Sequence, residues 1–490
     1  MYIESILNFA LKHGLICKED EAYSRNRLLE IMQMDAPETD GTIIESETLT
    51  PMLEGLCEEA AAKGIIEDSR ETRDLFSAKL AGAVTPAPYE IRDRFNKLAA
   101  ADKKAALEWF YQLCRDCDYI KVDRINKNVR YFAAGLEITI NLSKPEKDPR
   151  DIEKAKYVKS ADYPKCQLCI ENPGYAGRIG FPARQNHRVL PLTLGGESWH
   201  MQYSPYLYYN EHCIVFSDIH RDMLISHAGF ERLFDFVDLF PHYFLGSNAD
   251  LPIVGGSILT HDHFQGGNYV FPMDNAADEI TLDSGIPGMS AAIIDWPLSC
   301  LRLKSTDRQA LIAKADEILA AWREYSDADA GIFAKTYAPH NTITPILRKN
   351  GDEYILNLVL RNNRKDDEHK LGIFHPHSEL HHIKKENIGL IEVMGLMILP
   401  GRLLTELKEV EECLLGKREV EALSNPAHAE WTRELILKYG RMSDADKANA
   451  AVREEVALRC RRVLADAGVY KQTEQGRQAF KRFLNKVGLK

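Results

Sequence analysis

The period of the hydrophobic pattern changes near residue 129, and this change limits the folds that the chain can adopt. Before about residue 118, apolar side chains recur three and four residues apart, as in amphipathic helices. VRYFAAGLEITINL then alternates apolar and polar residues and is rich in β-branched ones, which predicts strands around Gly135. The last ninety residues return to helical spacing. The sequence therefore predicts a core of mixed strands and helices between N-terminal and C-terminal helical regions.

Short strand-like runs and helical runs alternate through the predicted core. Residues 212–216, 252–259 and 268–271 are strand-like, and FERLFDFVDLF is helical. A second mixed unit follows, in which AAIIDWPLSCLRL and YILNLVLRN are typical of strands and RQALIAKADEILAAWREY is typical of a helix.

Charge and composition exclude several classes of protein. The 490-residue chain carries a formal charge of −11, which argues against nucleic acid as a partner because phosphate backbones require a basic surface. No stretch of about 20 apolar residues is present, so no membrane span is expected. MYIESILNFALKHG has no basic start and no long apolar core, so it does not resemble a signal peptide. Ten cysteines in so long a chain indicate a reduced, cytoplasmic protein rather than a disulfide framework.

Two histidines stand two residues apart in NADLPIVGGSILTHDHFQGG, residues 248–267. On an extended backbone, side chains two apart point to the same face, so His261 and His263 share a surface with Gln265. Asp262 points the other way, and we interpret it as a local anchor. The pattern H-x-H alone is weak, because it also suits half of a metal site or two polar strand residues.

The residues around the pair favour phosphoryl chemistry. A neutral imidazole is nucleophilic near pH 7 and can form a covalent bond to phosphorus, which we assign to His263. Gln265 can donate an amide hydrogen to a non-bridging oxygen in the transition state. The loop of Gly255, Gly256 and Ser257 offers backbone N–H groups to a phosphate.

The cysteines include two pairs with the spacing of half a zinc site. These are Cys166-x-x-Cys169 and Cys114-x-x-Cys117. Taken together, they suit a Cys₄ site by pattern alone. Packing within a helix is the competing interpretation for Cys114 and Cys117.

DLPIVGGSILTHDHFQGG resembles the signature of the class II galactose-1-phosphate uridylyltransferases, and H-D-H-F-Q more distantly resembles the histidine triad superfamily. LEITINLSKPEKDP, SPYLYYNEHCIVFSDIH and HHIKKENIGLIEVMG are also similar to this family, so the resemblance covers the full chain. It implies an α+β fold of two tandem histidine-triad-like halves with antiparallel sheets. The expected boundaries are 1–125 for the N-terminal helical region, 126–285 for the half with the nucleophile, 286–400 for the second half, and 401–490 for the C-terminal helical region.

The resemblance implies a ping-pong reaction through a uridylylated His263. UDP-glucose would give its uridylyl group to this histidine and release glucose 1-phosphate, and galactose 1-phosphate would then accept the group to form UDP-galactose. The resemblance further implies that Lys144 and Lys385 contact substrate and that the protein is a homodimer. For Lys144, a solvated charged turn is the competing interpretation. CQLCIENPGYAGR and FSDIH are similar to the metal-binding segments of class I enzymes. They imply a structural zinc bound by Cys166, Cys169, His220 and His261.

Two rival functions remain open at this stage. A histidine-triad nucleotide hydrolase or phosphorylase would use the same His263 with water or phosphate as the acceptor. A non-catalytic zinc-binding interaction protein would need neither His263 nor Gln265, and their presence beside glycines argues against it.

Overall fold

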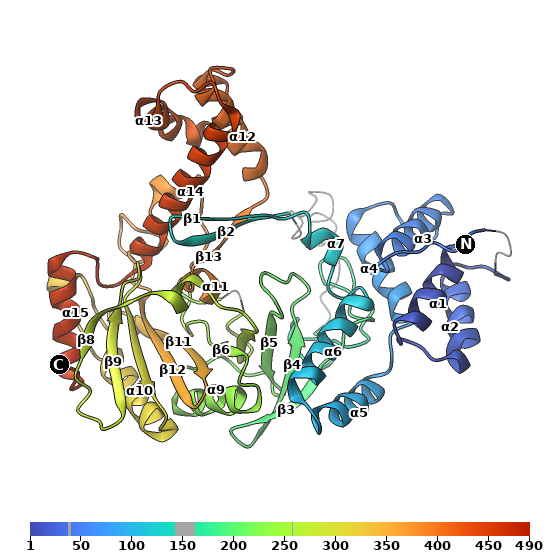
Figure 1. Ribbon diagram of the computed structural model, residues 1–490, viewed down its shortest axis with the longest axis horizontal. Coiled ribbons are helices and arrows are strands. Elements are labelled where there is room, and N and C mark those ends of the chain that lie inside the picture. The colour runs from blue at the N-terminus through green and yellow to red at the C-terminus, as the bar shows by residue number, and fades with distance from the viewer. Residues whose placement is uncertain (38–40, 143–161, 257) are drawn as a thin grey trace. The chain divides into compact units, whose positions relative to one another are not determined.

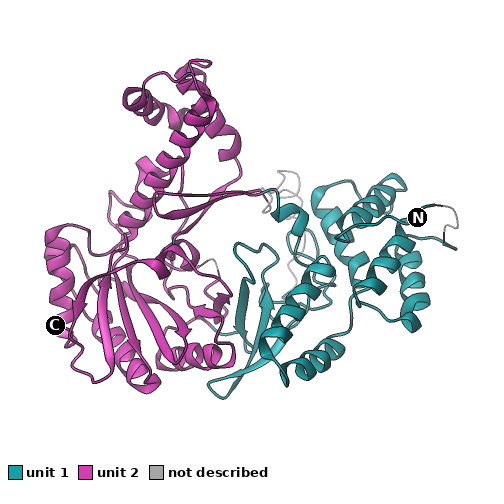
Figure 2. Ribbon diagram, in the orientation of Figure 1, with its two compact units in different colours: residues 1–127, 143–221 teal, residues 128–142, 222–490 magenta. Residues whose placement is uncertain are grey.

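The computed structural model describes residues 1–37, 41–142, 162–256 and 258–490. These residues form two compact units, shown in teal and magenta in Figure 2. Unit 1 comprises residues 1–127 and 143–221, and unit 2 comprises residues 128–142 and 222–490.

Unit 1 begins with the expected helical region, shown in blue in Figure 1. The N-terminal caps explain where several helices begin; for example, the Asp102 carboxylate accepts a hydrogen bond from Lys104 N at 2.8 Å. Strands β3, β4 and β5 follow and pair antiparallel in that order. The elements are α1 (Tyr2–Lys12), α2 (Glu21–Ile31), α3 (Thr50–Ala62), α4 (Arg70–Gly82), α5 (Pro88–Ala99), α6 (Lys103–Asp116), α7 (Val122–Ile125), β3 (Leu190–Leu194), β4 (Glu197–Tyr203) and β5 (Cys213–Ser217).

Unit 2 holds most of the mixed core and the C-terminal helices. Its main strands run antiparallel in the order β7-β6-β11-β12-β10-β9-β8, and α9 and α10 pack against them. The core elements are α9 (His227–Leu239), β6 (Phe244–Gly246), β7 (His263–Gly267), β8 (Asp278–Leu282), β9 (Met289–Ile294), β10 (Cys300–Ser305), α10 (Arg308–Arg323), β11 (Asn341–Asn350), β12 (Glu353–Asn362) and α11 (Leu390–Val393).

A smaller sheet and four helices complete unit 2. β2 pairs antiparallel with β1 and parallel with β13. The C-terminal helices appear in orange and red in Figure 1, and α14 packs against β1 and β2. The elements are β1 (Val129–Ala133), β2 (Leu136–Asn141), β13 (Leu396–Pro400), α12 (Leu403–Leu414), α13 (Ala429–Tyr439), α14 (Ala445–Ala467) and α15 (Glu474–Lys486).

The order of elements along the chain repeats. Three strands, one helix and two strands run from β3 to β7, and the same order runs from β8 to β12. This repetition confirms the predicted α+β fold with two tandem halves and helical regions at both ends. The nucleophile candidate His263 opens the last strand of the first series.

One face of the main sheet in unit 2 carries polar residues. The strand register places Gln265 opposite Gly246, Gly246 opposite Ile346, and Ile346 opposite Asn357. Residues opposite one another in register share a face, so this row continues to Arg302, the partner of Asn357. Leu356, Leu358 and Leu360 alternate with this row on β12 and lie on the other face. The row links Gln265 to the second series of strands.

Two predicted strands near the histidine pair are wrong. Residues 252–256 and 258–259 form turns and irregular chain, with one isolated bridge between Ala249 and Gly255. The chain doubles back here. As a result, Gly255 lies so close to Ala249 that a Cβ on Gly255 would be 2.3 Å from the Ala249 carbonyl oxygen. Residues 268–271 follow β7 and carry no strand; the strand ends at Gly267. The apolar runs here mark buried chain rather than strands.

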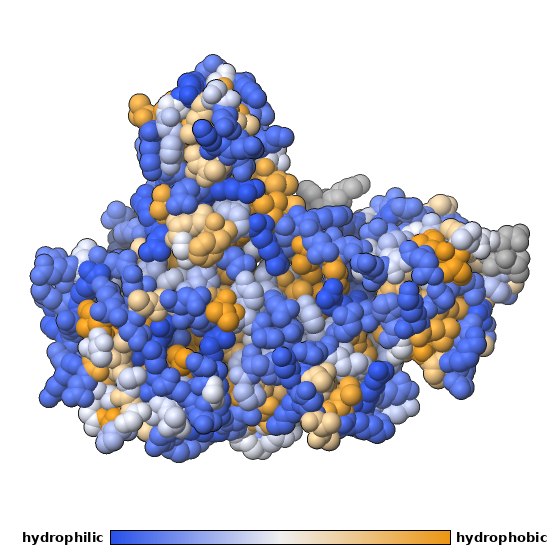
Figure 3. Space-filling model, viewed as in Figure 1, coloured by the Kyte–Doolittle hydropathy of each residue, from blue (hydrophilic) through white to orange (hydrophobic). Residues whose placement is uncertain are grey.

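The face shown in Figure 3 is mainly hydrophilic, with hydrophobic residues in small separate groups. None of the described helices is both long enough and apolar enough to cross a bilayer.

Candidate active site

His263 stands at the first position of β7 with one of its ring nitrogens fixed. Only 6% of the residue is exposed, and Nδ1 lies 2.8 Å from the carbonyl oxygen of His261. A carbonyl can only accept a hydrogen bond, so Nδ1 carries the proton and Nε2 carries the lone pair of the neutral ring. No described residue forms a hydrogen bond with Nε2. The backbone thus selects the tautomer that leaves Nε2 available as a nucleophile.

The surroundings of His263 keep the ring neutral. Burial lowers its pKa to about 4, and the hydrogen bond with the His261 backbone offsets this only in part. Near pH 7 the ring is therefore uncharged and retains the lone pair that an attack on phosphorus requires.

Gln265 lies two residues beyond His263 in β7. It is opposite Gly246 in the register with β6, and its side chain is partly buried. Since side chains alternate along a strand, His263 and Gln265 project from the same face. Asp262 precedes the strand and lies 3.9 Å from the guanidinium of Arg232 in α9, a contact that suits its interpretation as an anchor.

The glycines before the histidine pair have a structural explanation of their own. A Cβ on Gly255 would be 2.3 Å from the oxygen of Ala249, and one on Gly256 would be 2.7 Å from Nδ2 of Asn248. Both positions require glycine because the chain folds back tightly on residues 248–251. The predicted contacts of these glycines with a phosphate stay predictions. Ser257 and Lys144, which were predicted to bind substrate, lie outside the described residues.

A cluster of metal-ligand side chains has formed as predicted. In unit 1, the Cys166 and Cys169 sulfurs are 3.6 Å apart, and Cys169 Sγ is 3.2 Å from Nδ1 of His220. The side chain of Asn172 closes the turn that carries both cysteines, because its Nδ2 donates to the carbonyls of Cys166 and Cys169 at 2.8 and 2.7 Å. The donor atoms of Cys166, Cys169, His220 and His261 all lie within 4.8 Å of one another.

The chemistry of this donor set fits a metal ion. Two thiols and two imidazoles are the ligands of many tetrahedral zinc sites, and four ligands leave no open position for a substrate. Burial raises the pKa of the Cys166 thiol to about 12 when no cation is near. Cys114 and Cys117 lie outside the cluster; both are buried, and Cys117 Sγ donates to Asn186 O at 3.3 Å, as expected for packing residues.

Comparison with known proteins places the chain in a family. The family model of the galactose-1-phosphate uridyl transferase N-terminal domain matches residues 15–222, and that of the C-terminal domain matches residues 236–433. The chain belongs to the galactose-1-phosphate uridylyltransferase family. The two matches together cover most of the chain and include the histidine pair and all four metal-ligand candidates.

Full-length relatives carry the same family name. The galactose-1-phosphate uridylyltransferase of Caldanaerobacter subterraneus is 47% identical over 100% of this chain and 98% of its own length. That of Bacillus subtilis is 48% identical over 100% of this chain and 98% of its own length. Among solved structures, yeast Ap4A phosphorylase Apa2 covers 60% of this chain and 89% of its own, with 11% identity and a TM-score of 0.31, too low a likeness to bear on the fold.

The histidine-rich segment of the second half has a structural arrangement. His375 uses both ring nitrogens, Nδ1 toward Pro376 O and Nε2 toward Asn387 Oδ1, each at 3.2 Å. Lys385, the predicted substrate contact, is exposed at the surface. Its neighbour Lys384 is buried instead and forms an ion pair with Glu392 at 3.1 Å.

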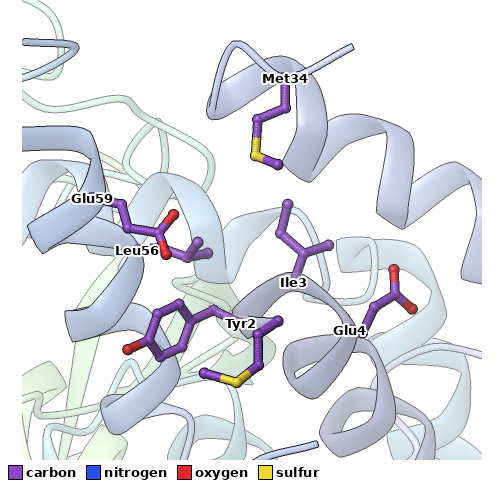
Figure 4. Close-up of a pocket in the computed structure, with 7 residues that line it drawn as sticks. Tyr2, Ile3, Glu4, Met34, Leu56 and Glu59 are labelled. Atoms are coloured by element: carbon purple, nitrogen blue, oxygen red, sulfur yellow. The ribbon is translucent and has the colours of Figure 1, made fainter. Parts of the chain in front are cut away.

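Two hollows lie in the N-terminal helices, away from the predicted site residues. The one in Figure 4, between Tyr2, Met34 and Leu56, has a volume of about 10 Å³ and can hold no more than a water molecule. A larger groove of about 540 Å³ is lined by α2, the end of α4 and the start of α5. Neither hollow contains His263, Gln265 or a member of the metal cluster.

Proposed function

We propose that the protein transfers a uridylyl group from UDP-glucose to galactose 1-phosphate by way of a covalent bond to Nε2 of His263. The products are UDP-galactose and glucose 1-phosphate. The observation that carries the proposal is the fixed tautomer of His263, whose Nδ1 donates to a backbone carbonyl and leaves Nε2 with its lone pair. The names of the full-length relatives support the choice of substrates.

In the first step, Nε2 attacks the α-phosphorus of UDP-glucose. The bond from this phosphorus to the bridging oxygen breaks, and glucose 1-phosphate leaves with the electron pair. The ring becomes positively charged because Nδ1 keeps its proton, and the His261 carbonyl oxygen stabilises that charge through the 2.8 Å hydrogen bond. In the second step, a phosphate oxygen of galactose 1-phosphate attacks the same phosphorus, and the pair of the N–P bond returns to Nε2. No proton changes its residue in either step.

Gln265 is the proposed partner of the transferred phosphoryl group. It shares a sheet face with His263 and is two residues away, so its amide can reach an oxygen of the phosphorus that Nε2 attacks. A neutral donor suits this position, since it stabilises charge that develops in the transition state without holding the product by an ion pair.

The proposed zinc has a supporting role. When bound, it would be a structural ion that holds Cys166, Cys169, His220 and His261 together. His261 is then fixed at its side chain, while its backbone oxygen fixes the tautomer of His263. Gly255, Gly256, Ser257, Lys144 and Lys385 remain the proposed contacts for substrate phosphates, and a homodimer remains the proposed assembly.

Isotope exchange tests this function against the hydrolase and phosphorylase alternatives. The enzyme is mixed with UDP-glucose and labelled glucose 1-phosphate, with galactose 1-phosphate absent. We expect label to enter UDP-glucose, because the first step is reversible on its own. Parallel double-reciprocal lines are expected when both substrates are varied. Intersecting lines without exchange would exclude the covalent route, and release of UMP into water at a rate similar to transfer would favour a hydrolase.

A further inference from the structure

Arg361 is a fully buried cation whose hydrogen bonds are incomplete. It lies in β12 with 1% of its surface exposed. Nη2 donates to the carbonyl oxygen of Ile388 at 2.9 Å, whereas Nε and Nη1 are buried and have no partner among the described residues. Burial lowers its pKa to about 10, so the guanidinium stays charged at neutral pH. Burying a charge with incomplete hydrogen bonds lowers the stability of the fold. This cost suggests that Arg361 has a role beyond packing.

A second buried arginine on the same sheet face has hydrogen-bond partners for all three of its guanidinium nitrogens. Arg302 in β10 is 5% exposed and donates to Asn357 Oδ1, Ala276 O and Met273 O at 2.8 to 3.0 Å. It also pairs with Asp278 at 3.2 Å. Register places Arg302 opposite Asn357, four residues before Arg361 on β12, so both arginines face the same way. Of these two arginines, Arg361 is the one whose Nε and Nη1 have no partner among the described residues.

The segment that Arg361 holds lies over the strand next to His263. Leu390 N, just beyond Ile388, donates to Asn248 Oδ1 at 2.9 Å. The Leu390 side chain packs on Gly246, where a Cβ would be only 3.0 Å from Leu390 Cδ1. Gly246 in turn lies opposite Gln265 in the register between β6 and β7. Figure 1 shows α11, which begins at Leu390, beside β6. We refer to residues 386–390 as the 386–390 segment. This segment therefore lies one strand away from Gln265.

Other contacts hold the residues on both sides of Ile388, and one of them joins Asn387 Oδ1 to His375 Nε2 at 3.2 Å. Lys384 pairs with Glu392 at 3.1 Å and donates to Ile398 O at 2.9 Å. Glu392 also accepts from Gly389 N at 3.2 Å. The carbonyl of Ile388, between these anchors, is held by Arg361. Lys384 also pairs with Glu386 at 3.5 Å, so its charge is balanced by carboxylates next to the segment.

We propose that the 386–390 segment forms a wall of the substrate site next to Gln265, and that Arg361 is the positioning residue that holds this wall in place for phosphorylated substrates. This inference rests on the proposed function. Arg361 acts through the Ile388 carbonyl and does not touch the reacting atoms. Losing it lets the wall shift while His263 and its hydrogen bond to His261 stay unchanged. Substrate binding should therefore suffer more than the covalent step.

The test compares Arg361→Met and Arg361→Lys with Arg302→Met and Arg302→Lys, in the full chain. KM and kcat are measured for the exchange reaction, together with the melting temperature and the UMP adduct formed at saturating UDP-glucose. For Arg361→Met we expect a rise in KM of about tenfold, on the scale of a misplaced binding wall, with kcat within about threefold. Arg361→Lys keeps the charge and should recover part of the loss. The Arg302 variants should lose stability and leave KM unchanged.

Each outcome bears on one claim. An unchanged KM in Arg361→Met would overturn the inference, as would an equal rise in KM in Arg302→Met. If Arg361→Met fails to fold, Arg361→Lys decides: wild-type KM in a stable variant overturns the inference. Absence of the UMP adduct in the wild-type enzyme would instead contradict the proposed function, so the two failures are distinguishable.

Discussion

His263 and His428 are both buried histidines with lowered pKa values, but they differ in how many ring nitrogens form hydrogen bonds. Burial is the main cause of the shift in each. His263 has one bonded nitrogen, at 2.8 Å from a carbonyl, whereas His428 has two. His428 Nε2 lies 2.8 Å from Glu406 Oε2, and Nδ1 lies 2.7 Å from Nδ1 of His382. Burial alone thus makes a neutral imidazole, and an unbonded nitrogen is what makes it a candidate nucleophile.

Other histidines of the second half follow the pattern of His428. His340 places Nε2 at 2.6 Å from Thr336 Oγ1 and Nδ1 at 2.8 Å from Asn363 Oδ1. His375 also has partners on both nitrogens. These rings tie loops together, and attack by any of them would first require breaking a buried hydrogen bond.

The largest expected effect follows from removing the free nitrogen. We expect His263→Ala to lower transfer by about 10⁴-fold or more, the scale of losing a covalent nucleophile. The fold should survive, because the ring makes a single hydrogen bond. His428→Asn is the matched variant: it should lower the melting temperature and keep transfer within about threefold. Initial rates measure transfer, and thermal melts measure stability, in both variants. Near wild-type transfer in His263→Ala would show that the unbonded nitrogen of His263 is not the nucleophile.

Gln265→Ala should have the next largest effect. We expect transfer to fall by about 10²-fold, the typical loss for one transition-state donor, with an unchanged melting temperature. Asn357→Ala is the control in the same row of the sheet. Its amide bonds Arg302 at 3.0 Å, so its loss should appear as reduced stability. A change of less than about threefold in Gln265→Ala would mean that backbone N–H groups bind the phosphate alone.

A smaller effect is expected from filling the space beside Gln265. The added methyl of Gly246→Ala would lie 3.0 Å from Leu390 Cδ1 and 3.1 Å from Pro345 O, so the strand or Leu390 must shift. We expect a loss of about 1–3 kcal/mol in stability and a several-fold fall in kcat/KM. Gly229→Ala in α9, where the nearest atoms are at 3.7 Å, should change neither. Equal results for the two variants would show that the packing of Leu390 on β6 is loose.

The last prediction concerns stability alone, and it involves the hydrogen-bonded pair of His382 and His428. Burial lowers the pKa of His382 to about 3 and also lowers that of His428, near the cations Arg402 and Arg459. Their unfolded pKa values are higher, so the unfolded chain binds more protons and stability falls as the pH drops below about 6.5. The slope should reach about 1.4 kcal/mol per pH unit for each proton. Glu406, whose pKa is also lowered, loses its contribution only below its unfolded value of 4.5.

Urea titrations of the wild type and of His382→Asn between pH 7.5 and pH 5 check this prediction. The wild type should lose more stability than the variant over that range. Identical losses would assign the pH dependence to other buried histidines, such as His187, whose pKa burial also lowers.

The sequence was most informative where function needs local spacing. The two-residue period brings His263 and Gln265 to one face, and the spacing of Cys166 and Cys169 gives half of a metal cluster. It was least informative where distant residues meet. His382 and His428 are 46 positions apart, and nothing local to Arg361 indicates that its guanidinium will bond Ile388. The wrong strand at 252–259 has a similar cause, since its glycines serve a close approach to residues 248–251 that only the fold creates.

The intact mass of the enzyme after mixing with UDP-glucose tests the central claim most directly. We predict that the wild type gains the mass of one uridylyl group, that peptide mapping places it on His263, and that adding galactose 1-phosphate removes it as UDP-galactose. His263→Ala should gain nothing, and His428→Asn should gain the same mass as the wild type. A wild-type enzyme that turns over both substrates while its mass stays unchanged, or an adduct on another residue, would contradict the account.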